Sequence, residues 1–80
     1  MYFVYLLRSK DFPEKTYVGY TTDVDQRLKV HNSGKSPYTD KYKPWEIHCY
    51  FAFANKQSAL QFELYLKSHS GRAFINKRLW

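Results

Sequence analysis

Runs of apolar residues divide this chain into extended and helical segments. Three segments rich in β-branched and aromatic residues predict strands: residues 2–8, 16–21 and 46–53. The loop between the first two, residues 9–15, contains Asp11 and Pro13, which favour a hairpin-like connection. Lys43 and Pro44 precede the third strand. We therefore expect a small and mostly antiparallel sheet.

The remaining periodic segments predict helices. They are a first helix from a cap at Thr22 or Asp23 to about Val30, a second from a cap at Asn55 to about Lys67, and a last short helix over residues 72–79. Thr, Asp and Asn suit these starts because their side chains accept hydrogen bonds from the free N–H groups of a first helical turn. The second helix has more apolar surface than a solvated helix needs, so it should pack on the sheet.

The predicted element order is ββαβαα in a chain of 80 residues. This length suffices for one domain with a modest core, and we treat residues 1–80 as a single domain. Hydrophobic residues make up 44% of the chain and aromatic residues 20%, which favours a folded protein. The fold class that follows is α+β, with a three-stranded sheet flanked by helices.

Positive charge is the main compositional signal. Lys and Arg total 13 against 7 acidic residues, which gives a formal net charge of +6. A small basic domain suits a polyanionic partner, because each cation placed on a phosphate releases counterions. Nucleic acid is the partner that this charge favours, although a merely soluble basic protein would share the composition.

The single cysteine and the apolar runs limit the cellular setting. Cys49 has no second cysteine to pair with, so no intramolecular disulfide can form and a cytoplasmic location is expected. The longest apolar run, residues 2–7, is much shorter than the roughly 20 residues of a membrane span. We therefore expect no membrane partner. A zinc site is disfavoured, because adjacent His48 and Cys49 would point to opposite faces of a strand.

Several polar residues could act on a phosphodiester. Tyr5 and Tyr17 lie in the first two strands, where a tyrosine usually serves as a core residue with its hydroxyl at the rim. Gly19 can relieve a bulge or a close backbone contact. Arg27 and His31 are four residues apart, so they share a helix face and could grip one phosphate. The alternative for this pair is an ordinary solvated face.

Glu63 is a carboxylate among apolar neighbours at helical spacing, Ala59, Leu60 and Leu66. A carboxylate beside a buried stripe needs a cation, hydrogen bonds or neutralisation. One solution is Mg²⁺ or Mn²⁺, because hard ions take oxygen ligands and keep several waters, so that one protein carboxylate can suffice. The other is an ion pair with Lys67 at position i+4. The spacing leaves both open.

The segment from residue 34 to residue 45 interleaves cations and aromatic rings: Lys35, Lys41 and Lys43 with Tyr38, Tyr42 and Trp45. Cations for phosphates beside flat rings for exposed bases form a plausible nucleic-acid surface. The same rings could instead fold back onto the core.

The order of these tyrosine, glycine, arginine, histidine and glutamate residues along the chain resembles that in the GIY-YIG nuclease family. Residues 3–5 and 17–19, Phe-Val-Tyr and Tyr-Val-Gly, are similar to the two tripeptides that name the family, with Phe3 in place of a glycine and Val18 in place of an isoleucine. The family's remaining functional positions match, in order, Arg27, His31, Glu63 and Asn76. The ending of the chain, residues 63–79, resembles small stand-alone bacterial members related to the nuclease domain of the excision-repair subunit UvrC.

This resemblance implies a hydrolytic DNA endonuclease that uses one divalent cation, Mg²⁺ or Mn²⁺. Glu63 would bind the ion. Tyr5 or Tyr17 would accept the proton of the attacking water, which requires a phenol pKa well below the usual value of about 10. Arg27 would stabilise the charge that develops on the phosphoryl oxygens, and His31 would orient the water or a tyrosine. The products would carry a 5′-phosphate and a 3′-hydroxyl.

The predicted DNA-binding residues are Lys35, Lys41, Lys43, Lys67, Arg72 and Asn76. Family nuclease domains usually take their targeting from attached domains, and none is present in these 80 residues. We therefore expect recognition of DNA structure rather than sequence, a role in repair or recombination, and a protein partner that supplies targeting.

Two rival classes of function remain open. A non-catalytic DNA-binding module would keep the basic surface but would need neither Glu63 nor paired tyrosines. A structural or protein-interaction domain would explain the aromatic residues as core and leave the positive charge without a role.

Overall fold

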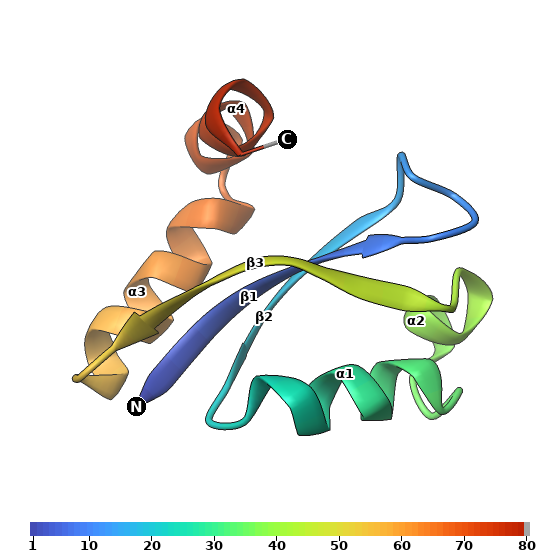
Figure 1. Ribbon diagram of the computed structural model, residues 1–80. Coiled ribbons are helices and arrows are strands. Elements are labelled where there is room, and N and C mark those ends of the chain that lie inside the picture. Colours follow the sequence, from blue (N-terminus) through green and yellow to red (C-terminus); the bar gives the residue numbers. More distant parts are fainter. Residues whose placement is uncertain (80) are drawn as a thin grey trace.

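The computed structural model describes residues 1–79, and within them it contains three strands and four helices (Figure 1). The elements are β1 (Tyr2–Ser9), β2 (Thr16–Thr21), α1 (Val24–Asn32), α2 (Pro37–Lys41), β3 (Trp45–Phe53), α3 (Lys56–Lys67) and α4 (His69–Arg78). The predicted α+β class with an antiparallel three-stranded sheet is confirmed. The five-residue helix α2 lies inside the segment of residues 34–45, for which no helix was predicted.

The sheet has the strand order β2-β1-β3, with both pairings antiparallel. The central strand β1 is covered on both faces, and its residues Val4 to Leu7 are all buried. Because side chains alternate along a strand, Val4 and Leu6 face one side of the sheet while Tyr5 and Leu7 face the other. A register shift in the β1–β3 ladder falls between Leu6 and Leu7.

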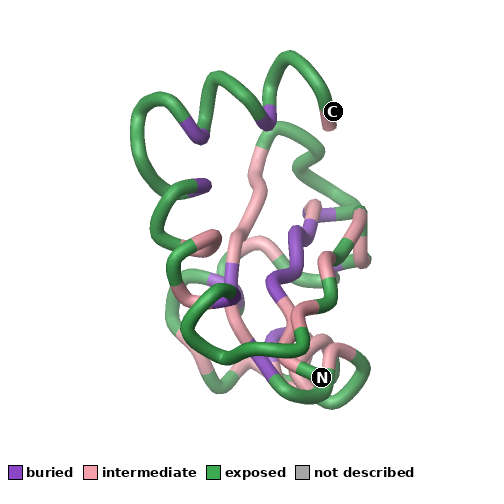
Figure 2. The backbone as a smooth tube through the Cα atoms, turned by 90° about the vertical axis from the view of Figure 1, so that its left-hand side faces the viewer, coloured by how far each residue is buried: buried purple, intermediate pink, exposed green. Residues whose placement is uncertain are grey.

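Each face of the sheet has its own core, so the fold has three layers (Figure 1). On one side Val4 and Leu6 pack with residues of α3 and α4: Ala59, Leu66 and Ile75. On the other side Tyr5, Leu7 and Trp45 form a second cluster, against which α1 packs Val24 and Leu28. Figure 2 shows this distribution as buried positions along the strands, with mostly exposed positions on the C-terminal helices.

The predicted caps of two helices are confirmed. The Asp23 carboxylate accepts the backbone N–H of Gln26 at the start of α1, and the Asn55 side chain accepts that of Ser58 at the start of α3. The last helix differs from the prediction, since α4 begins at His69 rather than at residue 72. Its N-cap is Ser68, whose side chain accepts the backbone N–H of Gly71, so residues 69–71 lie inside the helix and not before it.

Gly71 lies inside α4 and allows it to pack closely against α3. It is buried, and a Cβ at this position would lie 1.8 Å from the backbone oxygen of Tyr65 in α3. The absence of a side chain therefore allows the start of α4 to approach the end of α3 closely.

The aromatic residues between α1 and β3 turn partly onto the core. Trp45 is 1% exposed, and its indole N–H donates to the Thr39 carbonyl at 2.8 Å. The Asn32 side chain brackets the Trp45 backbone, accepting its N–H at 2.6 Å and donating to its carbonyl at 3.1 Å. The prediction that Trp45 offers a ring to exposed bases is therefore wrong, because the indole serves as core. Tyr38 remains 45% exposed.

A search of residues 1–79 finds no helix of the length and apolarity that a membrane crossing requires.

Candidate active site

Strand register sets the position of Tyr5. On the β1–β2 ladder Tyr5 pairs with Gly19, so the phenol ring extends over a residue that has no side chain. A Cβ at position 19 would lie 2.4 Å from the Tyr5 hydroxyl oxygen and 2.5 Å from the adjacent ring carbon. Of the two explanations left open for Gly19, the structure favours the close contact: glycine makes room for the Tyr5 ring.

Three rings from three elements meet beside this point. The Tyr5 hydroxyl on β1 lies 2.9 Å from His31 Nε2 on α1, across a sequence separation of 26 residues. The Tyr17 ring on β2 has its centre 4.7 Å from that of His31 and 6.2 Å from that of Tyr5. His31 is buried, so the alternative of a solvated face does not hold for this side chain. The helix face that carries Arg27 and His31 instead points to the two phenols.

The protonation of His31 follows from its surroundings. Burial, and secondarily the positive charge of Arg27, lowers the pKa of His31 from its usual 6.5. The imidazole is therefore neutral at pH 7, and Nε2 can accept the Tyr5 O–H while Nδ1 carries the proton, an assignment made from the hydrogen bond. Within residues 1–79, Nδ1 is a buried atom without a hydrogen-bond partner.

Tyr5 is held in its protonated form. Burial is the largest of the influences that raise the pKa of its phenol above 10, and the nearby Tyr17 and Glu63 add to it. A hydrogen bond and the positive charge from Arg27 oppose this shift without cancelling it. The depressed phenol pKa that a general base requires is thus absent at Tyr5, because desolvation outweighs one guanidinium. Arg27 keeps its Nε buried and without a hydrogen-bond partner in the described part of the chain.

Glu63 forms the ion pair that the sequence left open. Its Oε2 lies 3.1 Å from Lys67 Nζ, one helical turn along α3. The Glu63 side chain is 17% exposed and that of Lys67 is 47% exposed. Because Glu63 also raises the pKa of Tyr5, its carboxylate lies within electrostatic reach of the Tyr5 phenol. Residues 1–79 contain no group of three or more His, Cys, Asp or Glu side chains that could hold a metal.

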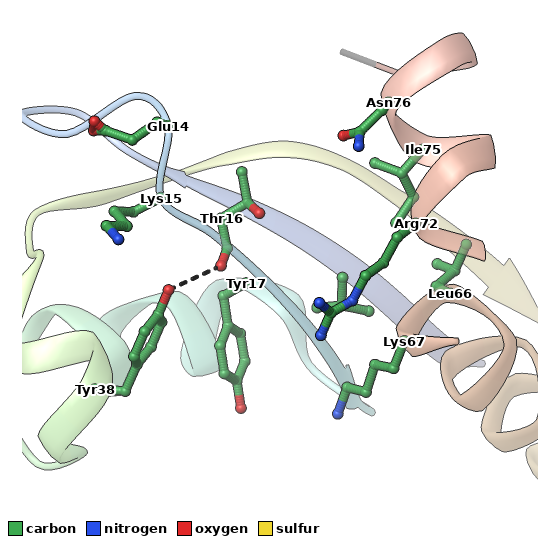
Figure 3. Close-up of a pocket in the computed structure, with 11 residues that line it drawn as sticks. Glu14, Lys15, Thr16, Tyr17, Tyr38, Leu66, Lys67, Arg72, Ile75 and Asn76 are labelled. Carbon is green, nitrogen blue, oxygen red and sulfur yellow. Dashed lines mark hydrogen bonds between the residues drawn. The ribbon is translucent and has the colours of Figure 1, made fainter. Parts of the chain in front are cut away.

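An open groove of about 650 Å³ runs from β2 to α4 (Figure 3). Four of the predicted site residues line it: Tyr17, Lys67, Arg72 and Asn76. In Figure 3, Tyr17 and Tyr38 stand on one side of the groove, while Lys67 and Arg72 extend into it from the helical side. The Tyr38 hydroxyl lies 3.4 Å from the backbone oxygen of Thr16. The aromatic rings of Tyr17 and Tyr38 therefore lie opposite the cations of Lys67 and Arg72.

The other predicted DNA-binding lysines lie outside the lining of this groove. Lys43 pairs with Asp40 at 2.8 Å, and both side chains are about half exposed. Lys41 lies 5.7 Å from the centre of the Tyr42 ring. Lys35 is exposed beyond the end of α1. Sequence reasoning also missed Lys15, which lines the groove. Lys15 lies two residues before Tyr17 in the sequence, and this proximity to a predicted site residue could have indicated it.

Comparisons with known proteins agree with this architecture. The family profile described as "GIY-YIG catalytic domain" matches residues 1–78. The UPF0213 protein BH0048 of Halalkalibacterium halodurans is 42% identical over 72 residues, which cover 89% of this chain and 74% of the relative. The structure-specific endonuclease subunit SLX1 of Debaryomyces hansenii is 42% identical over 69 residues, 78% of this chain but 20% of the relative.

A solved structure has the same fold. The solution NMR structure of the UPF0213 protein BH0048 from Bacillus halodurans superimposes with a TM-score of 0.55 at 34% sequence identity. The alignment covers 99% of this chain and 87% of that one.

Proposed function

The chain belongs to the GIY-YIG catalytic domain family, and we propose that it is a DNA endonuclease which hydrolyses phosphodiester bonds with the help of one divalent metal ion. We assign this activity to residues 1–80 as one domain. The observation that carries the proposal is the meeting of Tyr5, Tyr17 and His31 beside a groove lined by cations. A relative named as a structure-specific endonuclease subunit supports the reaction class.

Tyr17 is the better candidate for the phenol that accepts a proton from the attacking water. It lines the groove, whereas Tyr5 is 1% exposed and its hydroxyl is engaged with His31. Tyr5 is then a positioning residue: it holds His31 against the Tyr17 ring and keeps the imidazole in one tautomer. The choice between the two phenols depends on which hydroxyl can meet water in the groove.

Arg27 suits a role in charge stabilisation. Its guanidinium lies near Tyr5 and His31, since it affects the pKa of both groups. An unpaired buried N–H is costly in a folded protein. The unpaired Nε–H of Arg27 would therefore gain a hydrogen-bond acceptor when a phosphoryl oxygen of the DNA binds beside it. Such a preorganised donor stabilises the charge that develops on the phosphorus oxygens.

The donor set at Glu63 fits Mg²⁺ or Mn²⁺. A carboxylate is the hard oxygen ligand that these ions prefer, and each ion can complete its coordination with water and substrate phosphate. Oε2 of Glu63 accepts a hydrogen bond from Lys67 Nζ at 3.1 Å, so a bound ion would compete with this ammonium group for the carboxylate. When bound, the ion would polarise the phosphate and lower the pKa of water. Glu63 would hold it near the three rings.

DNA would enter along the groove, with phosphates on the wall formed by Lys67, Arg72 and Asn76. Lys35, Lys41 and Lys43 would contact the backbone farther from the reaction centre. We propose recognition of DNA structure rather than sequence, and a repair or recombination role with a targeting partner. The name of the SLX1 relative, which includes the word subunit, supports such a partner.

A cleavage panel tests this function. Flap, nicked, mismatched, single-stranded and linear DNA would be incubated with Mg²⁺ or Mn²⁺, with wild type and with Glu63→Gln and Tyr17→Phe. We expect both variants to lose metal-dependent cleavage while they still bind DNA without metal. Tyr65→Phe, at an exposed phenol on α3, is the matched control and should cleave normally.

Three results would change the proposal. If wild type binds every substrate and cleaves none, the alternative of a non-catalytic DNA-binding module is favoured. If neither binding nor cleavage occurs, the structural or interaction domain is favoured. Normal cleavage by Tyr17→Phe would remove the proposed proton acceptor even if Glu63 proved essential.

A further inference from the structure

Lys67 stands between two places where an anion can hold its ammonium group. On one side it forms the 3.1 Å ion pair with Glu63. On the other side it lines the groove together with Arg72 and Asn76. Figure 3 shows the Lys67 and Arg72 side chains extending into the groove from the helical side. A single ammonium group can therefore neutralise Glu63 or contact a phosphate in the groove.

We propose, on the basis of the proposed function, that Lys67 is a positioning residue that couples DNA binding to metal binding. In the DNA-free protein Lys67 holds Glu63 and competes with the ion for the carboxylate. A DNA phosphate in the groove draws the ammonium away, and Glu63 becomes free for the metal. The protein would thus assemble its metal site mainly when substrate is present.

The difference in burial indicates which partner moves. Glu63 is 17% exposed on the packed side of α3, while Lys67 is 47% exposed. The lysine ammonium is a point charge on a flexible stem with three rotatable donors, so it can turn to a new acceptor without moving the helix. In residues 1–79 no cluster of three His, Cys, Asp or Glu side chains offers the ion another site. Movement of Lys67 would therefore release Glu63 for the ion.

Thermodynamic linkage makes the coupling measurable without cleavage. If DNA tightens metal binding through Lys67, metal must tighten DNA binding by the same factor. Removal of the lysine charge should free Glu63 permanently. Without DNA, the variant that lacks the Lys67 charge should then bind metal as tightly as the DNA-bound wild type does. Added DNA should tighten its metal binding little further.

The test is titration with Mn²⁺, with free ion followed by electron paramagnetic resonance. Wild type, Lys67→Gln, Arg72→Gln and Glu63→Gln would each be titrated alone and with a saturating phosphorothioate oligonucleotide, which resists hydrolysis; Mn²⁺ bound by the oligonucleotide itself is subtracted. Arg72→Gln is the matched control: it removes a cation from the same groove, and Arg72 makes no ion pair within residues 1–79. Glu63→Gln locates the ion.

We expect Lys67→Gln to bind Mn²⁺ about fivefold more tightly than wild type, as for loss of an ion pair of ordinary strength. The oligonucleotide should tighten Mn²⁺ binding by wild type and Arg72→Gln about fivefold, and by Lys67→Gln less than about twofold. Circular dichroism would show that the exposed substitution leaves the fold intact.

If the Lys67→Gln and Arg72→Gln substitutions tighten Mn²⁺ binding equally in the absence of the oligonucleotide, the proposal is overturned, because the result would show a general charge effect. An undiminished oligonucleotide effect in Lys67→Gln, or no Mn²⁺ binding by any form, would overturn it too. If the titrations follow expectation while wild type cleaves no DNA, the endonuclease proposal fails and the coupling stands.

Discussion

The two faces of the sheet share one central strand and bury different chemistry. Toward α3 and α4, alternate residues of β1 pack with Ala59, Leu66 and Ile75 in a cluster of apolar side chains. Toward α1, the intervening residues Tyr5 and Leu7 pack with Trp45, and the Tyr5 hydroxyl bonds to the buried imidazole of His31. The packing of the α3–α4 face therefore depends on side-chain volume, and the packing of the α1 face depends also on directed polar contacts.

This difference indicates what substitutions on each face should change. Apolar packing tolerates volume-conserving exchange, whereas a buried polar group is costly unless its partner is in place. Substitutions on the α3–α4 face should change stability, while substitutions on the α1 face should change chemistry at smaller cost to the fold.

The largest expected effect is on the α3–α4 face. Leu6 is completely buried there. Leu6→Ala should lower the free energy of unfolding by about 2–5 kcal/mol, because it removes buried methyl groups and leaves a cavity. Urea unfolding followed by circular dichroism measures this value. A loss below about 1 kcal/mol would mean that this face is not the stabilising core.

Arg27→Lys should have the next largest effect, and it should act on the rate. Lysine keeps the positive charge and loses the planar fork that contacts two oxygens at once. Cleavage should fall by roughly 10²-fold, as for loss of a preorganised donor. Single-turnover cleavage at saturating enzyme gives the rate, and urea unfolding should match wild type. A comparable rate with reduced stability would place Arg27 with the structural residues.

Gly19→Ala should affect both properties, because its added Cβ would meet the Tyr5 phenol at 2.4 Å. Forced repacking of this kind costs about 1–3 kcal/mol. The displaced ring should also break the hydrogen bond to His31, which an NMR titration of the imidazole would report as a changed pKa. Wild-type stability together with an unchanged titration would show that Tyr5 does not need the space above residue 19.

The smallest expected effect is the pH dependence of stability that His31 produces. Its pKa is lowered in the folded protein by burial and then by Arg27, while the unfolded chain keeps a value of about 6.5. Between these values the unfolded chain binds more protons. The free energy of unfolding should therefore fall as pH drops below about 6.5, by at most about 1.4 kcal/mol per pH unit, and level off below the folded-state pKa.

Urea unfolding at several pH values from 7.5 to 5 in ~0.5 steps measures this slope. His31→Gln is the control, since it keeps a polar side chain without a titrating ring, and it should lack this part of the slope. Identical slopes in wild type and His31→Gln would show that His31 has the same pKa in the folded and unfolded chain.

Local signals determined most of the elements and most of the candidate site residues. β-branched and aromatic runs determine the strands, and Asp23 and Asn55 determine where α1 and α3 begin, because capping acts over three residues. The order of Tyr5, Tyr17, Arg27, His31 and Glu63 along the chain indicated the family, which the profile match to residues 1–78 supports. Their roles remain proposals.

Interactions between distant segments decided the rest. Packing of α4 against the Tyr65 backbone places Gly71 inside a helix, and the fold around Trp45 converts a candidate stacking ring into core. Burial raises the pKa of Tyr5, which sequence cannot reveal because desolvation depends on what covers the side chain. The sequence determined which groups are present. Tertiary structure decided which of them meet, because strand register and helix packing bring together residues 26 positions apart.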